Sequence, residues 1–193
     1  MGFPSVLSQA QRWVKERAGP GDIVVDATAG NGSDTLFLAR TVGPRGRVYA
    51  FDVQAEALDS TRRRLEGEAA TSSPLAPVEL IRAGHETMER FLPPEARGRV
   101  AAVMFNLGYL PGVPSPVITL PATTLAAMES SLRLLRTGGA LTVVAYPGHE
   151  GGRAEADAVE AWAAALPQAV AQAVVYRFPQ KTASPFLIAA DKK

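Results

Sequence analysis

The sequence predicts a doubly wound α/β sandwich, and three observations lead to this prediction. Short apolar runs alternate with helix-length amphipathic segments along the chain. The apolar runs do not alternate with polar residues, as expected for strands that are buried on both faces of a parallel sheet. Of the 193 residues, 47% are hydrophobic, which is enough for one full core and too much for a disordered chain. We expect a single domain, 1–193, in which an N-terminal helix within 1–19 packs on or beside the sheet.

The elements follow from local pattern. A strand is expected where a short apolar run is bounded by turn residues, and a helix where apolar residues recur every three or four positions. The expected strands are 22–27, 47–52, 78–83, 100–106 and 140–146, followed by an antiparallel pair at 171–178 and 184–190. The expected helices are one from Val6 to the stop sequence AGPGD, then 33–42, 54–69, 85–92, 124–136 and 153–166.

Composition excludes several classes of protein. The absence of cysteine rules out disulfides and thiolate metal sites and suits a reducing cytosol. The two histidines lack the spacing of metal ligands, so we expect no metal. The first residues do not read as a signal peptide, and no segment has the roughly 18 apolar residues of a membrane helix. A net charge of +1 does not by itself indicate a nucleic-acid binder. We expect a cytoplasmic protein with no membrane partner, for which a homodimer is an open alternative.

The sequence DATAGNGSDT, after the first expected strand, is a glycine-rich turn. Gly30 and Gly32 allow a tight turn and close approach of a ligand to the backbone. A dinucleotide-binding turn has a third glycine where this chain has Thr35, and it holds a pyrophosphate that Asp26 would repel. S-adenosylmethionine has no phosphate and carries an ammonium and a sulfonium, so an acid here favours it. The alternative is a structural turn in which Asp26 caps the helix.

Two more positions belong with this turn. Asp52 ends the second expected strand, where an acid can accept hydrogen bonds from both ribose hydroxyls. His85 follows the third expected strand, where it could contact the adenine ring, although a capping or surface role is equally open. The candidate residues for binding S-adenosylmethionine are Asp26, Thr28, Gly30, Asn31, Gly32, Asp34, Thr35, Asp52, Gln54, His85 and Asn106.

The fourth expected strand ends in NLGY, which resembles the pattern of amino-group methyltransferases with Leu-Gly in place of Pro-Pro. Asn106 would lie beside the methyl donor, because the fourth strand neighbours the first at the switch point of this fold. Its side-chain oxygen can accept a hydrogen bond from an amine and so aim the lone pair. Tyr109 can stack on the ring that carries the amine. The alternative is that Asn106 caps the strand and Tyr109 is a core aromatic.

A third candidate catalytic residue is His149, in the sequence YPGHEGG after the fifth expected strand. It could orient the substrate or take a proton from an ammonium, since only the neutral amine is a nucleophile. A purely structural role in the loop is the alternative. Arg62, Arg63 and Arg64 are consecutive in a helix and cannot share a face, so we expect them in solvent.

The chain resembles a small bacterial family of rRNA methylases, now associated with methylation of the wobble uridine of tRNA. The resemblance covers about 20–190 and rests on DATAGNGSDTLFLA, FDVQ, FNLGYLPG, TTLAAMESSLRLL, GGALTVVAYPGHEGG and PFLIA. It implies a class I methyltransferase that uses S-adenosylmethionine. It also implies a tRNA anticodon stem-loop as partner, with 5-aminomethyl-2-thiouridine converted to its methylaminomethyl form.

The chain departs from the family pattern on the side expected to hold the substrate. Val113, Pro114 and Ser115 replace a Gly-Asp-basic segment, Pro179 replaces an Asn, and a double proline is reduced to Pro185. The reaction is therefore better indicated than the substrate. The alternatives are a methyltransferase for rRNA or for a small-molecule amine and, third, an NAD-dependent oxidoreductase.

Overall fold

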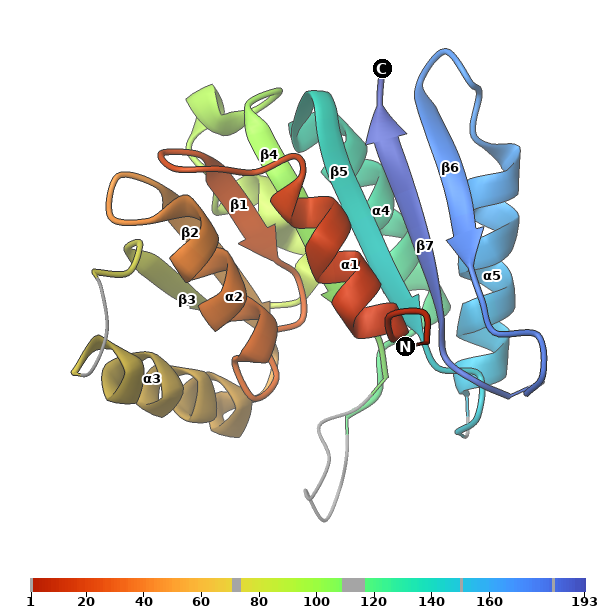
Figure 1. The fold of residues 1–193 in the computed structure, drawn as a ribbon, viewed down its shortest axis with the longest axis horizontal. Helices are drawn as coiled ribbons and strands as arrows, with labels where there is room; N and C mark the ends of the chain where they lie inside the picture. Colours follow the sequence, from red (N-terminus) through yellow and green to blue (C-terminus); the bar gives the residue numbers. More distant parts are fainter. Residues whose placement is uncertain (1, 71–73, 109–116, 150, 182) are drawn as a thin grey trace.

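The structure, a computed structural model, describes residues 2–70, 74–108, 117–149, 151–181 and 183–193. In this part of the chain seven strands form one sheet in the order β3-β2-β1-β4-β5-β7-β6 (Figure 1). They are β1 (Ile23–Asp26), β2 (Arg47–Asp52), β3 (Val78–Arg82), β4 (Val100–Asn106), β5 (Leu135–Ala145), β6 (Ala171–Tyr176) and β7 (Phe186–Lys192). Among the described strands, β7 runs opposite to the other six and pairs antiparallel with β5 and β6. The predicted doubly wound sheet with a closing antiparallel pair is confirmed.

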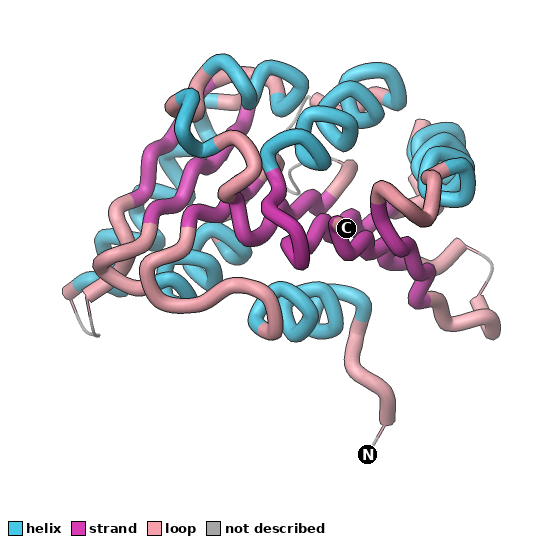
Figure 2. The backbone as a smooth tube through the Cα atoms, turned by 90° about the horizontal axis from the view of Figure 1, so that it is seen from above, coloured by secondary structure: helices cyan, strands magenta, loops and turns pink. Residues whose placement is uncertain are grey.

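Helices cover both faces of the twisted sheet (Figure 2). One face carries α1 (Val6–Lys15), α2 (Ser33–Val42) and α3 (Ala55–Ala69), and the other carries α4 (Pro121–Leu134), α5 (Gly152–Ala165) and the 3-10 helix η1 (His85–Arg90). A second 3-10 helix, η2 (Pro94–Ala96), precedes β4. Buried residues of the strands pack into two large apolar clusters, one beneath each helical layer. None of the described helices has the length and apolar character needed to cross a membrane.

Local signals set the boundaries of α2. Gly32 precedes the helix with φ of 81°, in the left-handed region, and Gly43 follows it with φ of 60°. Both conformations favour glycine, so the chain can enter and leave the helix sharply. Asp34 in the first turn complements the helix dipole. The expected boundaries of this helix and of β2 and β4 are confirmed to the residue.

The boundary between α4 and β5 was predicted wrongly. The expected helix 124–136 ends two residues earlier, and β5 begins directly at Leu135, which pairs with Val100 of β4. Arg136 follows in the strand, and its guanidinium binds the carboxylate of Asp22, with Nη1 2.8 Å from Oδ1. These partners are distant in sequence, so the helical periodicity could not reveal where the strand takes over.

The first helix packs on the sheet next to β5 and β7 (Figure 1). Ser5 caps it, with the Ser8 backbone N–H donating to Ser5 Oγ at 3.2 Å. The Tyr176 hydroxyl of β6 donates to the Pro4 carbonyl at 2.8 Å, which connects the start of α1 to the far edge of the sheet. Beyond the other end of the helix, Arg136 Nη2 of β5 donates to the Arg17 carbonyl at 2.9 Å, so hydrogen bonds to the sheet hold the chain on both sides of α1.

Two glycines make a matched test of packing. A Cβ added at Gly46, in the turn before β2, would lie 2.5 Å from Val42 Cγ2 and 2.7 Å from the Asp22 carbonyl oxygen. A Cβ at Gly67 of α3 would meet nothing within 4 Å. We expect Gly46→Ala to lower the free energy of unfolding by about 1–3 kcal/mol through overpacking. Gly67→Ala should leave it unchanged or raise it by up to about 1 kcal/mol. Urea denaturation of both variants checks this, and equal effects would contradict it.

Candidate functional site

A cavity of about 680 Å³ opens at the carboxyl edge of the sheet, where β1 and β4 lie side by side. This size is typical of sites for small molecules and cofactors. Predicted residues that line it are Thr28, Gly30, Asn31, Asp34, Asp52, Gln54, His85, Asn106 and His149. Asp26, Gly32 and Thr35 lie behind this lining. Tyr109 and the departing residues Val113 to Ser115 lie outside the described residues. No group of three or more His, Asp or Glu suited to a metal occurs in the described ranges.

The glycine-rich turn is held from the β2 side. Asp52 accepts hydrogen bonds from the backbone N–H groups of Gly30, at 3.0 Å, and Gln54, at 2.9 Å. Each carboxylate oxygen keeps a further lone pair, so Asp52 can still accept hydrogen bonds from a ligand in the cavity. The turn also lies close to α3, since a Cβ at Gly32 would be 2.8 Å from Thr61 Cα. Gly32 is therefore required both by its positive φ and by this close approach.

One of the three consecutive arginines does more than face solvent. Arg64 Nε donates to the Asn31 carbonyl at 2.7 Å, which supports the turn from α3. Arg62, by contrast, pairs with Asp59 on the same helix at an exposed position. The helical spacing did separate these side chains, but it gave no signal that Arg64 reaches the turn.

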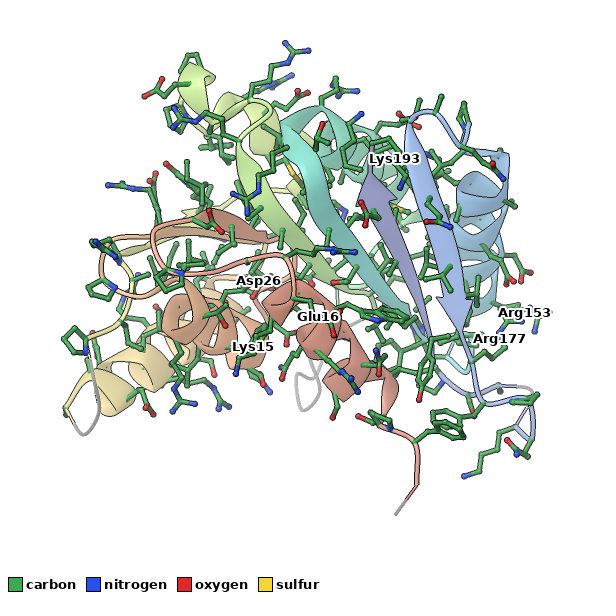
Figure 3. The ribbon with its side chains drawn as sticks, turned by 45° about the horizontal axis from the view of Figure 1, so that its top comes forward. Lys15, Glu16, Asp26, Arg153, Arg177 and Lys193 are labelled. Atoms are coloured by element: carbon green, nitrogen blue, oxygen red, sulfur yellow. The ribbon has the colours of Figure 1, made fainter. Side chains whose placement is uncertain are left out.

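Asp26 is 1% exposed and acts from beneath the turn. Its Oδ2 accepts a hydrogen bond from Thr35 Oγ1 at 2.6 Å, and its Oδ1 accepts one from the Thr28 N–H at 3.1 Å. Figure 3 shows Asp26, of the central strand β1, far from Arg153 of α5 and from Arg177, which follows the edge strand β6. Burial, reinforced by the charge of Asp34, raises the pKa of Asp26 to about 7.

Asp34 carries a carboxylate to the cavity wall. The amide of Gln11, from α1, donates to Asp34 Oδ1 at 2.8 Å. Burial raises the pKa of Asp34, and the hydrogen bond from Gln11 opposes that shift. Sequence reasoning missed Gln11, because the periodicity of the first helix identifies its apolar face and says nothing of a polar residue that reaches the next helix.

His85 is 7% exposed, and its ring packs edge-to-face on Phe105 with centroids 5.5 Å apart. Its Nδ1 lies 3.3 Å from the Ala27 carbonyl oxygen. A carbonyl can only accept, so Nδ1 carries the hydrogen and Nε2 is left as an acceptor. Burial lowers the pKa of His85, which keeps the ring neutral at physiological pH.

Asn106 ends β4 at the centre of the cavity. Its backbone N–H donates to the Thr28 hydroxyl at 2.7 Å, which connects the ends of β4 and β1. Its side chain makes a hydrogen bond with Tyr146, which opposes the rise in the pKa of that phenol caused by burial and by the charge of Asp34. The Asn106 Oδ1 atom is buried and has no hydrogen-bond partner among the described residues.

His149 lines the same cavity, close to Gly108 and Gly152. A Cβ at Gly108 would be 3.3 Å from His149 Nε2, and one at Gly152 would be 2.7 Å from it. The two glycines leave room for the ring, which accounts for one of the glycines after His149, Gly152. The loop thus positions the imidazole beside the end of β4.

The fold and this cavity define a class I methyltransferase that depends on S-adenosylmethionine. The sequence model of the family described as "Putative rRNA methylase" matches residues 48–191, and the chain belongs to that family. The NAD-dependent oxidoreductase alternative is thereby discarded.

The chain is similar to proteins of known description. It is 44% identical over 152 residues to the chloroplastic "tRNA (mnm(5)s(2)U34)-methyltransferase" of Arabidopsis thaliana, a match that covers 76% of this chain. The match covers 54% of that relative, so the chain spans about half its length. The crystal structure of a "putative rRNA-methylase" from Clostridium thermocellum has a TM-score of 0.91 and 36% identity over the whole of both chains. That of a "putative methyltransferase" from Streptococcus mutans in complex with SAH has a TM-score of 0.85 and 34% identity, also over both whole chains.

The state of Asp26 gives a testable dependence of stability on pH. From about pH 4, the ordinary pKa of aspartate, to about pH 7, the folded protein holds a proton that the unfolded chain has released. The free energy of unfolding should therefore fall as pH rises through this window, by up to about 1.4 kcal/mol per pH unit. Asp26→Asn, which does not titrate, should lose the part of this dependence that comes from Asp26.

Urea denaturation of both proteins without ligand, at pH 5 and pH 8, measures it. From pH 5 to pH 8, the free energy of unfolding of Asp26→Asn should rise by at least about 1 kcal/mol relative to that of wild type. A difference that is constant with pH would show that Asp26 is ionised in the folded protein.

Proposed function

We propose that this protein transfers a methyl group from S-adenosylmethionine to the 5-aminomethyl nitrogen of wobble 2-thiouridine in tRNA. The observation that carries the proposal is the buried Asn106 Oδ1, which has no hydrogen-bond partner among the described residues. A buried acceptor without a partner costs free energy, so this oxygen suits a ligand that brings a donor. The N–H of an amine is such a donor.

The chemistry of N-methylation explains why an acceptor is needed. A nitrogen attacks the methyl carbon with its lone pair, so its N–H bonds must point elsewhere. Asn106 Oδ1 can accept one of them at the end of β4, beside the turn after β1. The names of two relatives agree with nitrogen chemistry on tRNA. One is the Arabidopsis enzyme, and the other is a "tRNA (guanine(6)-N2)-methyltransferase" of Thermus thermophilus, 39% identical over 88 residues.

The methyl donor occupies the β1–β2–β3 side of the cavity in this proposal. The Asp52 carboxylate accepts hydrogen bonds from the ribose hydroxyls, and the neutral His85 ring lies at the adenine. Asp34 faces the ammonium of the amino-acid end, since it reaches the lining while Asp26 does not. Asp26, Gly32 and Thr35 support this set from behind. Bound there, S-adenosylmethionine supplies an electrophilic methyl group. The set is completed by Thr28, Gly30, Asn31 and Gln54.

The substrate occupies the β4–β5 side. An aminomethyl group is largely an ammonium at neutral pH and must lose a proton before it can attack. His149 lies on this side of the cavity, within reach of the end of β4. We assign it the removal of that proton, and Asn106 the orientation of the neutral amine that results. Tyr109 is proposed to stack on the uracil ring.

Mass spectrometry of nucleosides tests the proposal directly. Transfer RNA that carries 5-aminomethyl-2-thiouridine, incubated with the protein and S-adenosylmethionine, should gain 5-methylaminomethyl-2-thiouridine. Asn106→Ala should lower the rate of transfer about 100-fold, because misaligned attack is that costly, and should still bind the methyl donor.

The affinity for S-adenosylmethionine, measured by calorimetry, and the melting temperature are the controls for this variant. Full activity of a folded Asn106→Ala protein would remove the residue from the proposal. Methylation of rRNA or of a free amine, with wobble uridine unchanged, would replace tRNA by one of those substrates.

The role of His149 predicts a particular pH dependence. If the imidazole removes the proton from the ammonium, His149→Ala should lower turnover by about 10²–10⁴-fold near neutral pH. The loss should shrink as pH rises, because the amine then deprotonates in solution. Single-turnover rates between pH 6.5 and pH 9.5 measure this. A loss of the same size at every pH would assign His149 to positioning alone.

A further inference from the structure

We propose that Glu155 is a positioning residue for methyl transfer, which acts through Thr119 and Thr124 on the turn that follows Asn106. This inference rests on the proposed function, because it concerns the substrate side of the same site. We call Glu155, Thr119 and Thr124 the Glu155 clamp.

The clamp joins two helices and the segment that precedes α4. Glu155 lies in the first turn of α5 and is 2% exposed. Its Oε2 accepts a hydrogen bond from Thr119 Oγ1 at 2.6 Å, and its Oε1 accepts one from Thr124 Oγ1 at 2.6 Å. Thr124 is fully buried in the first turns of α4. Both carboxylate oxygens are therefore occupied within the protein.

From Thr119 the clamp reaches the end of β4. The Gly108 N–H donates to Thr119 Oγ1 at 3.0 Å, and the Thr119 N–H donates to the Gly108 carbonyl at 3.0 Å. Gly108 has φ of 118°, so this turn depends on external hydrogen bonds and on a glycine. The Leu107 N–H is bound in turn by the Val144 carbonyl, at 2.9 Å.

The charge of Glu155 determines the direction of these bonds. A carboxylate only accepts, so the Thr119 hydroxyl must donate to it and turn a lone pair toward the Gly108 N–H. Hydrogen bonds of 2.6 Å to a carboxylate are typical of the strong, charge-assisted class. A buried carboxylate would be costly without such partners, and its place in the first turn of α5 adds the favourable helix dipole.

Glu155 and Thr124 do not line the cavity, whereas Thr119, Gly108 and Asn106 do. Glu155 thus has no place to touch the substrate or the methyl donor. Its effect on the reaction must pass through Thr119 to Gly108, two residues after Asn106. Loss of the clamp should misalign the substrate amine while the methyl-donor side remains intact.

The decisive comparison uses two replacements at one position. Thr119→Ser keeps the hydroxyl and should retain kcat within about threefold of wild type. Thr119→Val keeps the shape, loses the hydroxyl and should lower kcat at least tenfold. Glu155→Gln should lower kcat similarly, because an amide NH2 group, which donates, replaces one of the accepting carboxylate oxygens. All three should bind S-adenosylmethionine with wild-type affinity. Glu160→Gln, at a half-exposed position on the same helix, is the matched control and should have no effect.

A second measurement needs no substrate. Hydrogen exchange of the Gly108 amide should accelerate at least tenfold in Thr119→Val and Glu155→Gln, and stay unchanged in Thr119→Ser and Glu160→Gln. Unchanged Gly108 exchange in Thr119→Val would overturn the clamp, as would equal kcat for Thr119→Ser and Thr119→Val. If Glu155→Gln fails to fold, the Thr119 pair decides. If wild type leaves tRNA unmethylated, the proposed function fails, whereas the exchange result still supports or overturns the clamp.

Discussion

One hydrogen bond joins the two halves of the cavity: the backbone N–H of Asn106 donates to the Thr28 hydroxyl at 2.7 Å. It lies where β1 and β4 are neighbours and the chain turns outward in opposite directions along the sheet. Parallel strands place their carboxyl ends on one edge, so this point collects loops from both sides. Because the bond joins the last residue of β4 to the second residue after β1, it couples the positions of the two halves of the site.

The halves are built by different means. On the proposed methyl-donor side, acidic side chains organise the chain: Asp52 binds the backbone N–H groups of Gly30 and Gln54, and Asp26 binds the Thr35 hydroxyl in the first turn of α2. These bonds hold the glycine-rich turn in one conformation before any ligand arrives. On the proposed substrate side, the Thr119 hydroxyl binds the Gly108 N–H and donates to the buried Glu155. Preorganisation of this kind reduces the entropy that must be lost when two reactants are brought together.

Much of the architecture follows from local sequence signals. The parts that do not follow from such signals have one physical cause in common. Helix 33–42 lies between Gly32 and Gly43, whose backbone angles depend on local sequence alone. Its limits could therefore be predicted. The end of α4 depends on the pairing of Leu135 with Val100, which no window of sequence contains. In the site, residues at strand ends such as Asp52 and Asn106 were found because the fold itself places them at one edge. Gln11 and Glu155 were missed because each lies on a helix whose pattern reports only its apolar face.

The antiparallel strand β7 has a consequence for the order in which the sheet can form. It lies between β5 and β6, yet it follows both of them along the chain. During synthesis β5 therefore presents an unpaired edge, and β6 has no neighbour in the sheet, until the residues of β7 have been made. Unpaired edges favour association between chains, and pairing over long sequence separation is slow. The last-made strand is thus the one that seals the sheet, and nascent chains that lack it are the species for which we expect chaperone dependence.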